Sequence, residues 1–348
     1  MEISIGNTPI GKGRKPFIIA EMSGNHNHSL DKALAIVKAA ADAGADAIKL
    51  QTYTPDSLTI DHRGGLFEIT DKKSLWYGRN LYDLYKDAMT PYEWHKPLFD
   101  FAKQLGIICF STPFNDEAVD MLEELGAPAY KIASFENNYH GLLRKVAEKN
   151  KPVIMSTGVS ELNDLIESVN ILKTAGCRDL ILLKCTSTYP ASPENTNLAT
   201  IPDMRRLFQC EIGLSDHTMG VGTAVAAVAL GAVVIEKHFC LSRAEGGVDS
   251  AFSLEPHEFK LLVEETKRGW LSLGEVRYGI LEAEKNSLNY KRSLYAVKDI
   301  KKGEYFSAEN IRVIRPGDGL HPRYYDIIIG KPAKKDILKG TPIHTDLF

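Results

Sequence analysis

Short apolar segments rich in β-branched residues alternate along this chain with longer segments of helical periodicity. The predicted strands are Phe17–Ser23, Ala47–Tyr53, Ile107–Phe114, Ala129–Phe135, Pro152–Gly158, Leu180–Ser187, Glu211–His217 and Ala232–Phe239. The predicted helices are Leu30–Ala43, Asn115–Leu125, Tyr139–Asn150, Glu161–Ala175, Val221–Leu230 and Pro256–Leu273. Eight such units indicate an α/β fold, a (β/α)8 TIM barrel, since no GxGxxG follows the first strand to suggest an open dinucleotide-binding sheet.

Each predicted strand begins with apolar residues and ends with polar ones. The strand sequences are FIIAE, AIKLQ, ICFST, YKIAS, VIMST, ILLKCTST, IGLSDH and VIEKH. The carboxyl ends of all strands in such a barrel meet on the face that carries the active site. We therefore expect a catalytic site where these polar ends converge.

The character of the sequence changes after Leu281. We predict a barrel domain over residues 1–281, a charged linker over 282–291 and a small β-rich domain over 292–348. Turns are expected at Lys301–Gly303, Pro316–Gly319 and Lys339–Gly340, between short strands.

Composition and charge exclude several classes of partner. The net charge is -3, without a long run of one sign, so no nucleic acid or membrane surface is expected to bind. No apolar run approaches the roughly 18 residues of a membrane span, and the N-terminal sequence lacks the pattern of a signal peptide. The five cysteines are scattered without metal-ligand spacing, which predicts a reduced, cytoplasmic protein.

Two histidines end neighbouring strands and are candidate metal ligands. His217 closes the seventh predicted strand and His238 the eighth. Adjacent strands can bring two imidazoles onto one divalent cation, and a site with open positions suits a catalytic metal. The alternative is that one or both rings only form local hydrogen bonds.

Cationic and hydroxyl side chains at other strand ends could bind a phosphate and a carboxylate together. Lys49 and Lys131 would supply charge, and Thr112, Ser134, Ser156 and Ser215 would donate hydrogen bonds. Each hydroxyl taken alone could instead cap a strand end. Lys184 and Lys237 are equally well explained by ion pairs with neighbouring carboxylates.

Three carboxylates are also placed near this face. Glu21 ends the first strand, Glu136 follows the fourth, and Asp249 lies in a glycine-containing loop after the last. Glu136 could activate water or move a proton. A salt bridge to a lysine would explain Glu136 as well, and a solvated loop would explain Asp249.

The ordered segments IAEMSGNHN, AGADAIKLQTY, FSTPF, AYKIASFE, STGVS, KCTSTYP, GLSDHT and VIEKHF resemble the sialic acid synthase family. The tail, RSLYAVKDIKKG followed by RPGDGLHP, resembles the antifreeze-like (SAF) domain of that family. Within the family, EMSGNHN, KLQTYTPDSLT, TPYEWH, LKCTSTYP and GLHP are most similar to the branch that makes pseudaminic acid. One departure is His28, where members often have glycine.

The resemblance implies a condensation of phosphoenolpyruvate with 2,4-diacetamido-2,4,6-trideoxy-L-altrose, giving pseudaminic acid and phosphate by C–O cleavage. It implies a divalent metal on His217 and His238, with Mn²⁺ first and Mg²⁺ or Co²⁺ as alternatives. The implied phosphoenolpyruvate ligands are Lys49, Thr112, Lys131, Ser134, Ser156 and Ser215. The implied sugar ligands are Glu21, Gln51, Tyr189, Asp249 and Arg315, and Glu136 would handle the water.

The family also implies a domain-swapped homodimer in which Arg315, in the SAF domain, reaches the partner's site. Rival interpretations are an N-acetylneuraminate or legionaminic acid synthase, which differ in the sugar. A Schiff-base aldolase is a rival of another mechanism, because a strand-end lysine in a barrel is also its signature. A third rival is a non-catalytic binding or ice-adsorbing protein, an interpretation that rests on the SAF-like tail alone.

Overall fold

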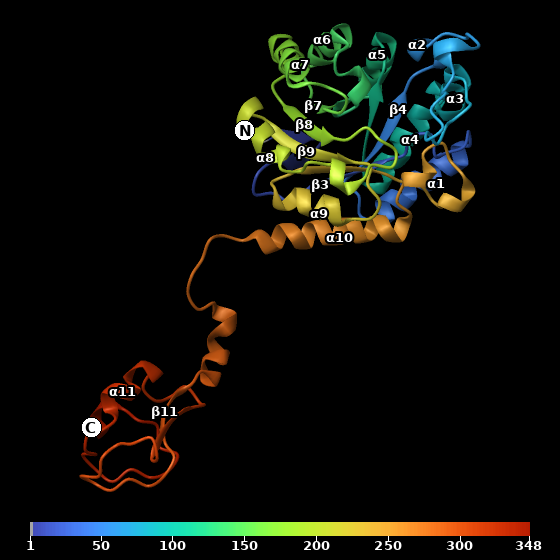
Figure 1. Ribbon diagram of the computed structural model, residues 1–348. Helices are drawn as coiled ribbons and strands as arrows, with labels where there is room; N and C mark the ends of the chain where they lie inside the picture. The colour runs from blue at the N-terminus through green and yellow to red at the C-terminus, as the bar shows by residue number, and fades with distance from the viewer. Residues whose placement is uncertain (1–2) are drawn as a thin grey trace. The chain divides into compact units, whose positions relative to one another are not determined.

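The computed structural model describes residues 3–348, which divide into two units (Figure 1). The first unit ends at Gly274 and the second runs from Glu275 to Phe348. The segment predicted as a linker contains a 3₁₀ helix, η6 (Glu282–Tyr290), and falls within the second unit. Among the described residues, no helix has the length and apolar character needed to cross a membrane.

The eight predicted strands form a closed parallel barrel. They are β3 (Phe17–Glu21), β4 (Ala47–Thr52), β5 (Ile108–Pro113), β6 (Tyr130–Ile132), β7 (Val153–Ser156), β8 (Leu180–Cys185), β9 (Glu211–Asp216) and β10 (Val234–His238). They follow one another around the barrel in chain order, and β10 closes it against β3. Each strand is one to four residues shorter than predicted because its polar end turns into a loop. The predicted (β/α)8 fold is confirmed.

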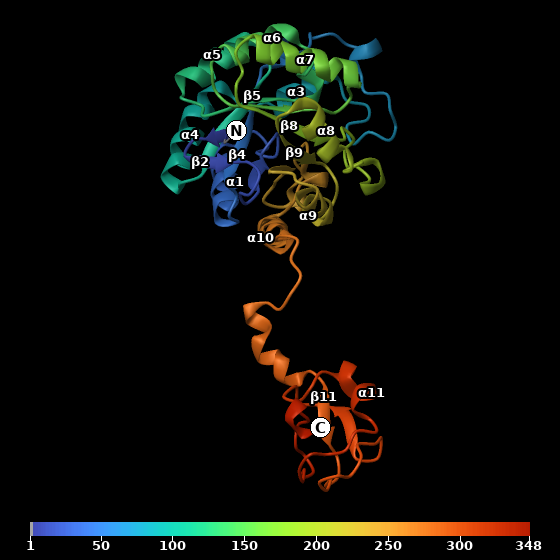
Figure 2. The same cartoon turned by 90° about the vertical axis from the view of Figure 1, so that its left-hand side faces the viewer.

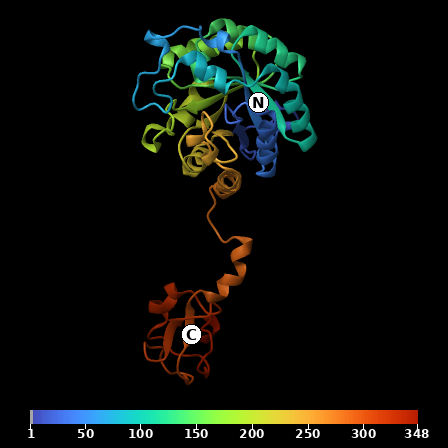
Figure 3. The ribbon, with the colours of Figure 1, turned by 90° about the vertical axis from the view of Figure 1, so that its right-hand side faces the viewer.

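Helices surround the strands, as the views in Figure 2 and Figure 3 show. The six predicted helices are α1 (Leu30–Asp42), α5 (Asp116–Glu124), α6 (His140–Ala147), α7 (Leu162–Thr174), α9 (Gly222–Ala229) and α10 (Pro256–Leu273). The structure adds α2 (Pro55–Leu58), α3 (Leu81–Ala88), α4 (Tyr92–Leu105) and α8 (Thr200–Phe208), which the sequence analysis did not predict. Pro97 inside α4 and Pro202 in the first turn of α8 weaken the helical signal there.

An N-terminal hairpin that was also not predicted closes one end of the barrel. Strands β1 (Ile3–Ile5) and β2 (Thr8–Ile10) pair antiparallel. Ile5 and Ile10 are fully or almost fully buried and belong to the apolar cluster that fills the barrel interior with Phe17 and Phe110. The amino-terminal end of the barrel is therefore apolar and filled, which leaves the opposite end for a ligand.

The second unit has its own apolar core, and it is small and β-rich as predicted. Strands β11 (Ser293–Ala296) and β12 (Ile311–Ile314) pair antiparallel, and one short helix, α11 (Tyr325–Ile328), packs with them. The core includes Leu294, Phe306 and Ile311, each at most 1% exposed. A turn forms at Lys301–Gly303, where Gly303 has a φ of 87°.

Candidate active site

Side chains that point into the barrel change from apolar to polar along each strand. In β3, Phe17 and Ile19 belong to the interior cluster, and Glu21 follows with the same alternation. In β10, Val234 is interior, and Glu236 and His238 follow it. Because successive strand residues face opposite sides, these polar residues lie above the apolar layer, inside the barrel mouth.

The site residues line a cavity of about 400 Å³ at the carboxyl ends of the strands. The cavity is lined, among others, by the predicted residues Glu21, Lys49, Gln51, Lys131, Ser134, Glu136, Ser156, Tyr189, Ser215, His217, His238 and Asp249. Thr112 lies directly behind this lining, where its Oγ1 accepts a hydrogen bond from Lys49 Nζ at 3.3 Å. The structure thus brings together every predicted site residue of the first unit.

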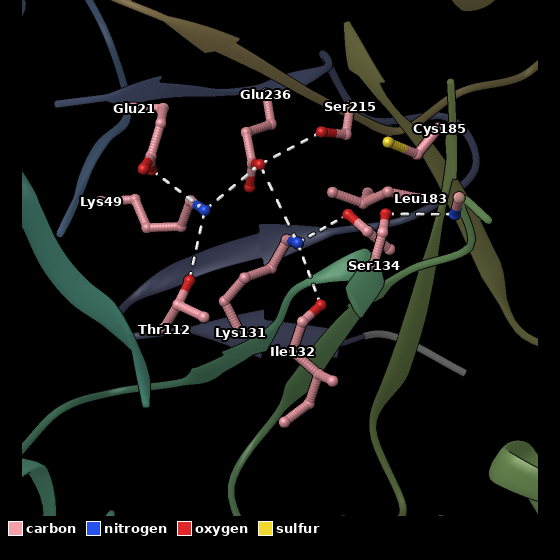
Figure 4. Close-up of polar contacts among 12 residues, drawn as sticks. Glu21, Lys49, Thr112, Lys131, Ile132, Ser134, Leu183, Cys185, Ser215 and Glu236 are labelled. Atoms are coloured by element: carbon pink, nitrogen blue, oxygen red, sulfur yellow. Dashed lines mark hydrogen bonds and ion pairs between the residues drawn. The ribbon is translucent and has the colours of Figure 1, made fainter. Parts of the chain in front are cut away.

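Two buried lysines form the floor of the cavity (Figure 4). Lys49 Nζ lies 3.0 Å from Glu21 Oε2, and Lys131 Nζ donates to Ser156 Oγ at 2.6 Å and to the carbonyl oxygen of Ile132 at 3.1 Å. Lys49 belongs to β4 and Lys131 to β6, on either side of β5, and both residues are at most 4% exposed. Their hydrogen atoms are held by hydroxyls and carboxylates, groups that an anionic ligand can replace or join.

Glu236 lies between the two lysines and was missed in the sequence analysis. Its Oε1 atom is 3.3 Å from Lys49 Nζ and 3.9 Å from Lys131 Nζ, and it accepts a hydrogen bond from Ser215 Oγ at 3.2 Å (Figure 4). The other carboxylate oxygen, Oε2, is buried without a hydrogen-bond partner in the described structure. The sequence could have revealed Glu236 as a site residue, because it precedes His238 by two residues and must lie on the same face of the strand.

Burial and charge set the protonation of this floor. Burial lowers the pKa of Lys131 to about 8, although the Glu236 carboxylate acts in the opposite direction. Burial raises the pKa of Glu21 to about 7, although the Lys49 ammonium opposes the shift. For Lys49, the carboxylates of Glu21 and Glu236 outweigh burial and raise the pKa. An added anion would therefore meet at least one firmly protonated lysine at neutral pH.

A glycine lets two hydroxyl-bearing loops meet beside the floor. Ser134 lies in a short 3₁₀ helix after β6, and its Oγ accepts a hydrogen bond from the backbone N–H of Gly158 at 3.1 Å. A Cβ atom at position 158 would lie 2.7 Å from Ser134 Oγ and 2.2 Å from Ser187 Oγ. Only glycine fits here, and its small size lets the hydroxyls of Ser134 and Ser187 both approach position 158.

The two predicted metal ligands are neighbours at the barrel mouth. The ring centroids of His217 and His238 are 5.3 Å apart. His217 Nδ1 lies 2.9 Å from the carbonyl oxygen of Thr186, so Nδ1 carries the proton in the neutral ring and Nε2 keeps its lone pair. His238 Nδ1 is buried without a hydrogen-bond partner in the described structure and lies 3.8 Å from Asp249 Oδ2.

These observations fit a divalent cation held by two imidazoles. A carbonyl that fixes the tautomer of one ring and a buried, unpaired nitrogen on the other are features of ligating histidines. No group of three or more His, Cys, Asp or Glu side chains is arranged for a metal within residues 3–348. The remaining positions would therefore belong to water or substrate, as in an open catalytic site.

A chain of polar contacts joins three of the predicted sugar ligands. Gln51 Nε2 donates to Glu21 Oε1 at 2.9 Å and to Ser23 Oγ at 3.2 Å. Ser23 Oγ in turn donates to Asp249, which brings the loop after β10 to the loop after β3. Ser23 was not among the predicted site residues, and its φ of 47° places it in the left-handed region. These hydrogen-bonded side chains present acceptors on the side of the cavity that adjoins His238.

Glu136 and Tyr189 complete the cavity. Burial raises the pKa of Glu136 to about 7, and the charge of Lys131 opposes this shift. The ring of Tyr189 lies 4.6 Å from that of His217 and 5.2 Å from that of Phe252, so it packs against one of the two candidate metal ligands. Arg315 follows β12 in the second unit, and its predicted contact with a partner's site stays a prediction.

His28, the departure from the family pattern, has a φ of 52°. This is the left-handed conformation that glycine adopts without strain, so a glycine would also fit at this position. The ring of His28 contacts the backbone carbonyl oxygen of Lys86 through Nε2 at 2.5 Å and packs against His26 and Trp94. It braces the first loop from outside the cavity.

Comparison with known proteins identifies the same two parts. The model of the NeuB family matches residues 36–278, and that of the SAF domain matches residues 291–348. A pseudaminic acid synthase of Campylobacter jejuni subsp. jejuni serotype O:2 is 48% identical over 97% of this chain and 97% of its own length. An N,N'-diacetyllegionaminic acid synthase of the same organism is 36% identical over 93% of this chain and 97% of its own.

A solved structure agrees with these matches. The N-acetylneuraminic acid (sialic acid) synthetase of Leptospira borgpetersenii serovar Hardjo-bovis superposes with a TM-score of 0.73 at 33% identity. It covers 83% of this chain and 96% of its own. The barrel, the polar strand ends and these similarities lead to one assignment: the chain belongs to the NeuB family and carries a C-terminal SAF domain.

Proposed function

We propose that the protein is a pseudaminic acid synthase. It condenses phosphoenolpyruvate with 2,4-diacetamido-2,4,6-trideoxy-L-altrose and water, and it releases pseudaminic acid and phosphate. The observation that carries this proposal is the floor of the cavity, where Lys49 and Lys131 lie beside the two adjacent imidazoles of His217 and His238. The 48% identity to a pseudaminic acid synthase, against 36% to a legionaminic acid synthase, supports the choice of sugar.

Phosphoenolpyruvate would bind at the lysine floor. Lys49 and Lys131 offset the charge of its phosphate and carboxylate, and both are already positioned by buried partners. Thr112 and Ser156 accept hydrogen bonds from these lysines, Ser134 accepts one from the Gly158 amide, and Ser215 donates one to Glu236. The hydroxyl protons of Thr112, Ser134 and Ser156 would be donated to the bound ligand. Preorganised cations and donors of this kind need little rearrangement when charge moves during the reaction.

The sugar would lie above, with its aldehyde toward the imidazole pair. Glu21, Gln51 and Asp249 offer acceptors and an amide to its hydroxyl and N–H groups, and Tyr189 covers it. His217 and His238 would hold the divalent metal, with Mn²⁺ our first choice and Mg²⁺ or Co²⁺ the alternatives. When bound, the metal would supply Lewis-acid polarisation of the aldehyde carbonyl.

Glu136 would orient and deprotonate the water. Carbon 3 of phosphoenolpyruvate forms the new bond to the aldehyde carbon, and the positive charge left at carbon 2 accepts the oxygen of water. The proton of this water goes to Glu136, whose raised pKa of about 7 suits both taking and returning it. The proton that Glu136 returns neutralises the alkoxide oxygen left by the aldehyde. The C–O bond to phosphate then breaks, the proton of the carbon 2 hydroxyl leaves with the phosphate, and carbon 2 becomes the ketone.

The test is phosphate release from phosphoenolpyruvate with Mn²⁺ and one of three aldehydes. These are 2,4-diacetamido-2,4,6-trideoxy-L-altrose, the D-mannose counterpart and N-acetylmannosamine. Release only with the altrose sugar is the expected result. Release with another sugar would move the specificity within the family, and no release with any would overturn the proposal.

Lys131 gives one observation in favour of a second mechanism. Its pKa, lowered to about 8 by burial, is suited to a lysine that forms a Schiff base. Its contacts with Ser156 and the Ile132 carbonyl oxygen instead hold it as a hydrogen-bond donor. Borohydride added during turnover would label an aldolase covalently, and we expect no label on this protein.

The cellular location and the oligomeric state of the enzyme are also part of the proposal. We expect a cytoplasmic homodimer whose SAF domains are exchanged, so that Arg315 of one protomer contacts the acetamido group of the sugar in the other. This would explain why a basic residue follows β12 in the RPGDG turn of a separate unit.

A further inference from the structure

One side of the cavity is formed by a segment that none of the predicted site residues occupies. Between β4 and α4 the chain makes two short helices, α2 and α3, with an irregular loop between them. Seven apolar or aromatic side chains of this segment line the cavity: Leu58, Ile69, Trp76, Leu81, Leu84, Tyr85 and Ala88. We call this surface the 58–88 wall.

The loop in the 58–88 wall is held in one conformation by hydrogen bonds. The backbone N–H of Ile69 donates to the carbonyl oxygen of Arg79 at 2.9 Å, and that of Gly78 donates back to Ile69 at 2.8 Å. The side chain of Asn80 donates to the carbonyl oxygen of His62 at 2.8 Å and also caps α3. These bonds close residues 69–79 into a hairpin-like loop whose tip carries Trp76.

Trp76 is tied to the other side of the cavity. Its indole N–H donates to the carbonyl oxygen of Val248 at 2.9 Å, next to the predicted sugar ligand Asp249. Its ring lies 5.8 Å from that of Tyr189, which lies 4.6 Å from His217. The indole therefore reaches from the wall to Val248 and to Tyr189, the ring that packs against His217, and it lines the cavity between them.

The chemistry of the wall differs from that of the rest of the cavity. Among its described lining residues, only Ser74 and the hydroxyl of Tyr85 are polar. A sugar hydroxyl pressed against the other side chains would lose its hydrogen bonds to water and find no partner. A methyl group in the same place would instead bury apolar surface on both sides. The wall is thus suited to a sugar in which hydroxyls are replaced by deoxy and N-acyl groups.

We propose that the 58–88 wall receives the 6-deoxy methyl and N-acyl methyl groups of the sugar, with Trp76 as the specificity-determining residue. This inference rests on the proposed function and adds to it the structural reason for selecting a deoxy, diacylated aldehyde. An apolar pocket rejects an analogue with one added hydroxyl by up to about 100-fold. We therefore expect a preference of about 10- to 100-fold for the deoxy sugar.

The test compares two sugars that differ in one oxygen atom. Binding of 2,4-diacetamido-2,4,6-trideoxy-L-altrose and of its 6-hydroxy counterpart is measured by calorimetry, with Mn²⁺ and 2-phospholactate present. The latter has the phosphate and carboxylate of phosphoenolpyruvate but lacks its nucleophilic carbon, so no turnover occurs. In Trp76→Ala we expect the preference to fall below about 3-fold, mainly through weaker binding of the deoxy sugar.

Two further variants test whether the effect is specific to the side chains that line the wall. Tyr77→Ala removes the neighbouring aromatic side chain, which is 53% exposed and does not line the cavity, and it should keep the wild-type preference. Ile69→Thr replaces the ethyl branch of this side chain with a hydroxyl, which leaves a little more space and adds a hydrogen-bond partner, and it should shift the preference toward the 6-hydroxy sugar. It also serves as the test if Trp76→Ala does not fold.

Equal binding of both sugars by the wild-type protein, or an unchanged preference in both Trp76→Ala and Ile69→Thr, would overturn the inference. The proposed function is judged separately, by phosphate release from the wild-type protein. A protein that releases phosphate but shows no preference at the wall would lose this inference and keep its function.

Discussion

At the residue scale, Glu136 and Lys131 should set the pH dependence of the reaction. The pKa of Glu136 is raised to about 7, so its carboxylate, which accepts the proton of water, forms only as the pH rises through that value. The pKa of Lys131 is lowered to about 8, so its charge is lost as the pH rises further. We predict a bell-shaped profile of kcat/KM with limbs near these two values.

Variants show which residue causes the acid limb of this pH profile. Glu136→Gln should lower kcat by about 100-fold or more and remove the acid limb, because no carboxylate remains to titrate. Glu161→Gln, at an exposed carboxylate at the start of α7, is the matched control and should behave as wild type. An acid limb that persists in the residual activity of Glu136→Gln would show that another group accepts the proton.

The histidine pair gives a second prediction at this scale. His217→Ala or His238→Ala should leave the barrel folded, because both rings lie at its mouth and outside the apolar interior cluster. Each should abolish tight binding of Mn²⁺ in calorimetry and all Mn²⁺-dependent phosphate release. The control is His140→Ala, a partly exposed histidine at the start of α6. Wild-type Mn²⁺ affinity in the double variant would contradict the metal assignment.

At the scale of elements, an ion pair on the outside of the barrel links β9 and β10 at the level of the site. Lys237 Nζ lies 2.6 Å from Asp216 Oδ2 and donates to the carbonyl oxygen of Thr218 at 2.5 Å. Thr218 donates back to Asp216 Oδ1 through its N–H and its hydroxyl. Both charged side chains are fully buried. The ion-pair explanation of Lys237 from the sequence is therefore correct.

Breaking the ion pair between Lys237 and Asp216 should lower the stability of the folded protein. Lys237→Met leaves Asp216 buried without its cation, and we predict a loss of about 3–5 kcal/mol in the free energy of unfolding, measured with urea. Replacing both residues, Lys237→Met with Asp216→Leu, should recover most of this loss. Lys38→Met removes an exposed pair with Asp42 and should cost less than about 1 kcal/mol. A Lys237→Met variant as stable as this control would contradict the argument.

At the scale of the whole molecule, much of the architecture follows from the sequence. The eight strands and the mouth of the barrel could be predicted because each strand switches from apolar to polar at its carboxyl end. Two elements could not be predicted: α4, whose helical pattern is interrupted by Pro97, and the β1–β2 hairpin, which is too short to show a periodic pattern. Glu236 was missed because it sits within an apolar run, although its alternation with His238 places it inside the barrel.

The 58–88 wall could not be predicted for a different reason. Trp76 lies in an irregular loop with no periodicity, and only its long-range bond to Val248 brings it to the cavity. Contacts between segments 172 residues apart leave no local pattern in the sequence. The same holds for the bond between Ser23 and Asp249, which joins the first and last loops of the barrel.

The exchange of SAF domains is a prediction about the assembly. If Arg315 acts in the partner's site, Arg315→Ala and His217→Ala are each inactive alone. Co-expressed and purified as a mixed dimer, they should regain activity, because one of the two sites then has both an intact histidine and an intact arginine. Activity that stays absent in the mixed dimer would indicate that Arg315 acts within its own protomer, and full activity of Arg315→Ala alone would show that it has no role in the site.

The most direct measurement for the whole account is the fate of oxygen when the reaction runs in H₂¹⁸O with phosphoenolpyruvate and the diacetamido-trideoxy-altrose. We predict one phosphate for each pseudaminic acid formed, and phosphate without ¹⁸O by mass spectrometry, because water adds to carbon 2 and the C–O bond breaks. Phosphate that carries ¹⁸O would mean that water attacks phosphorus, and the roles given to Glu136 and the lysine floor would be wrong.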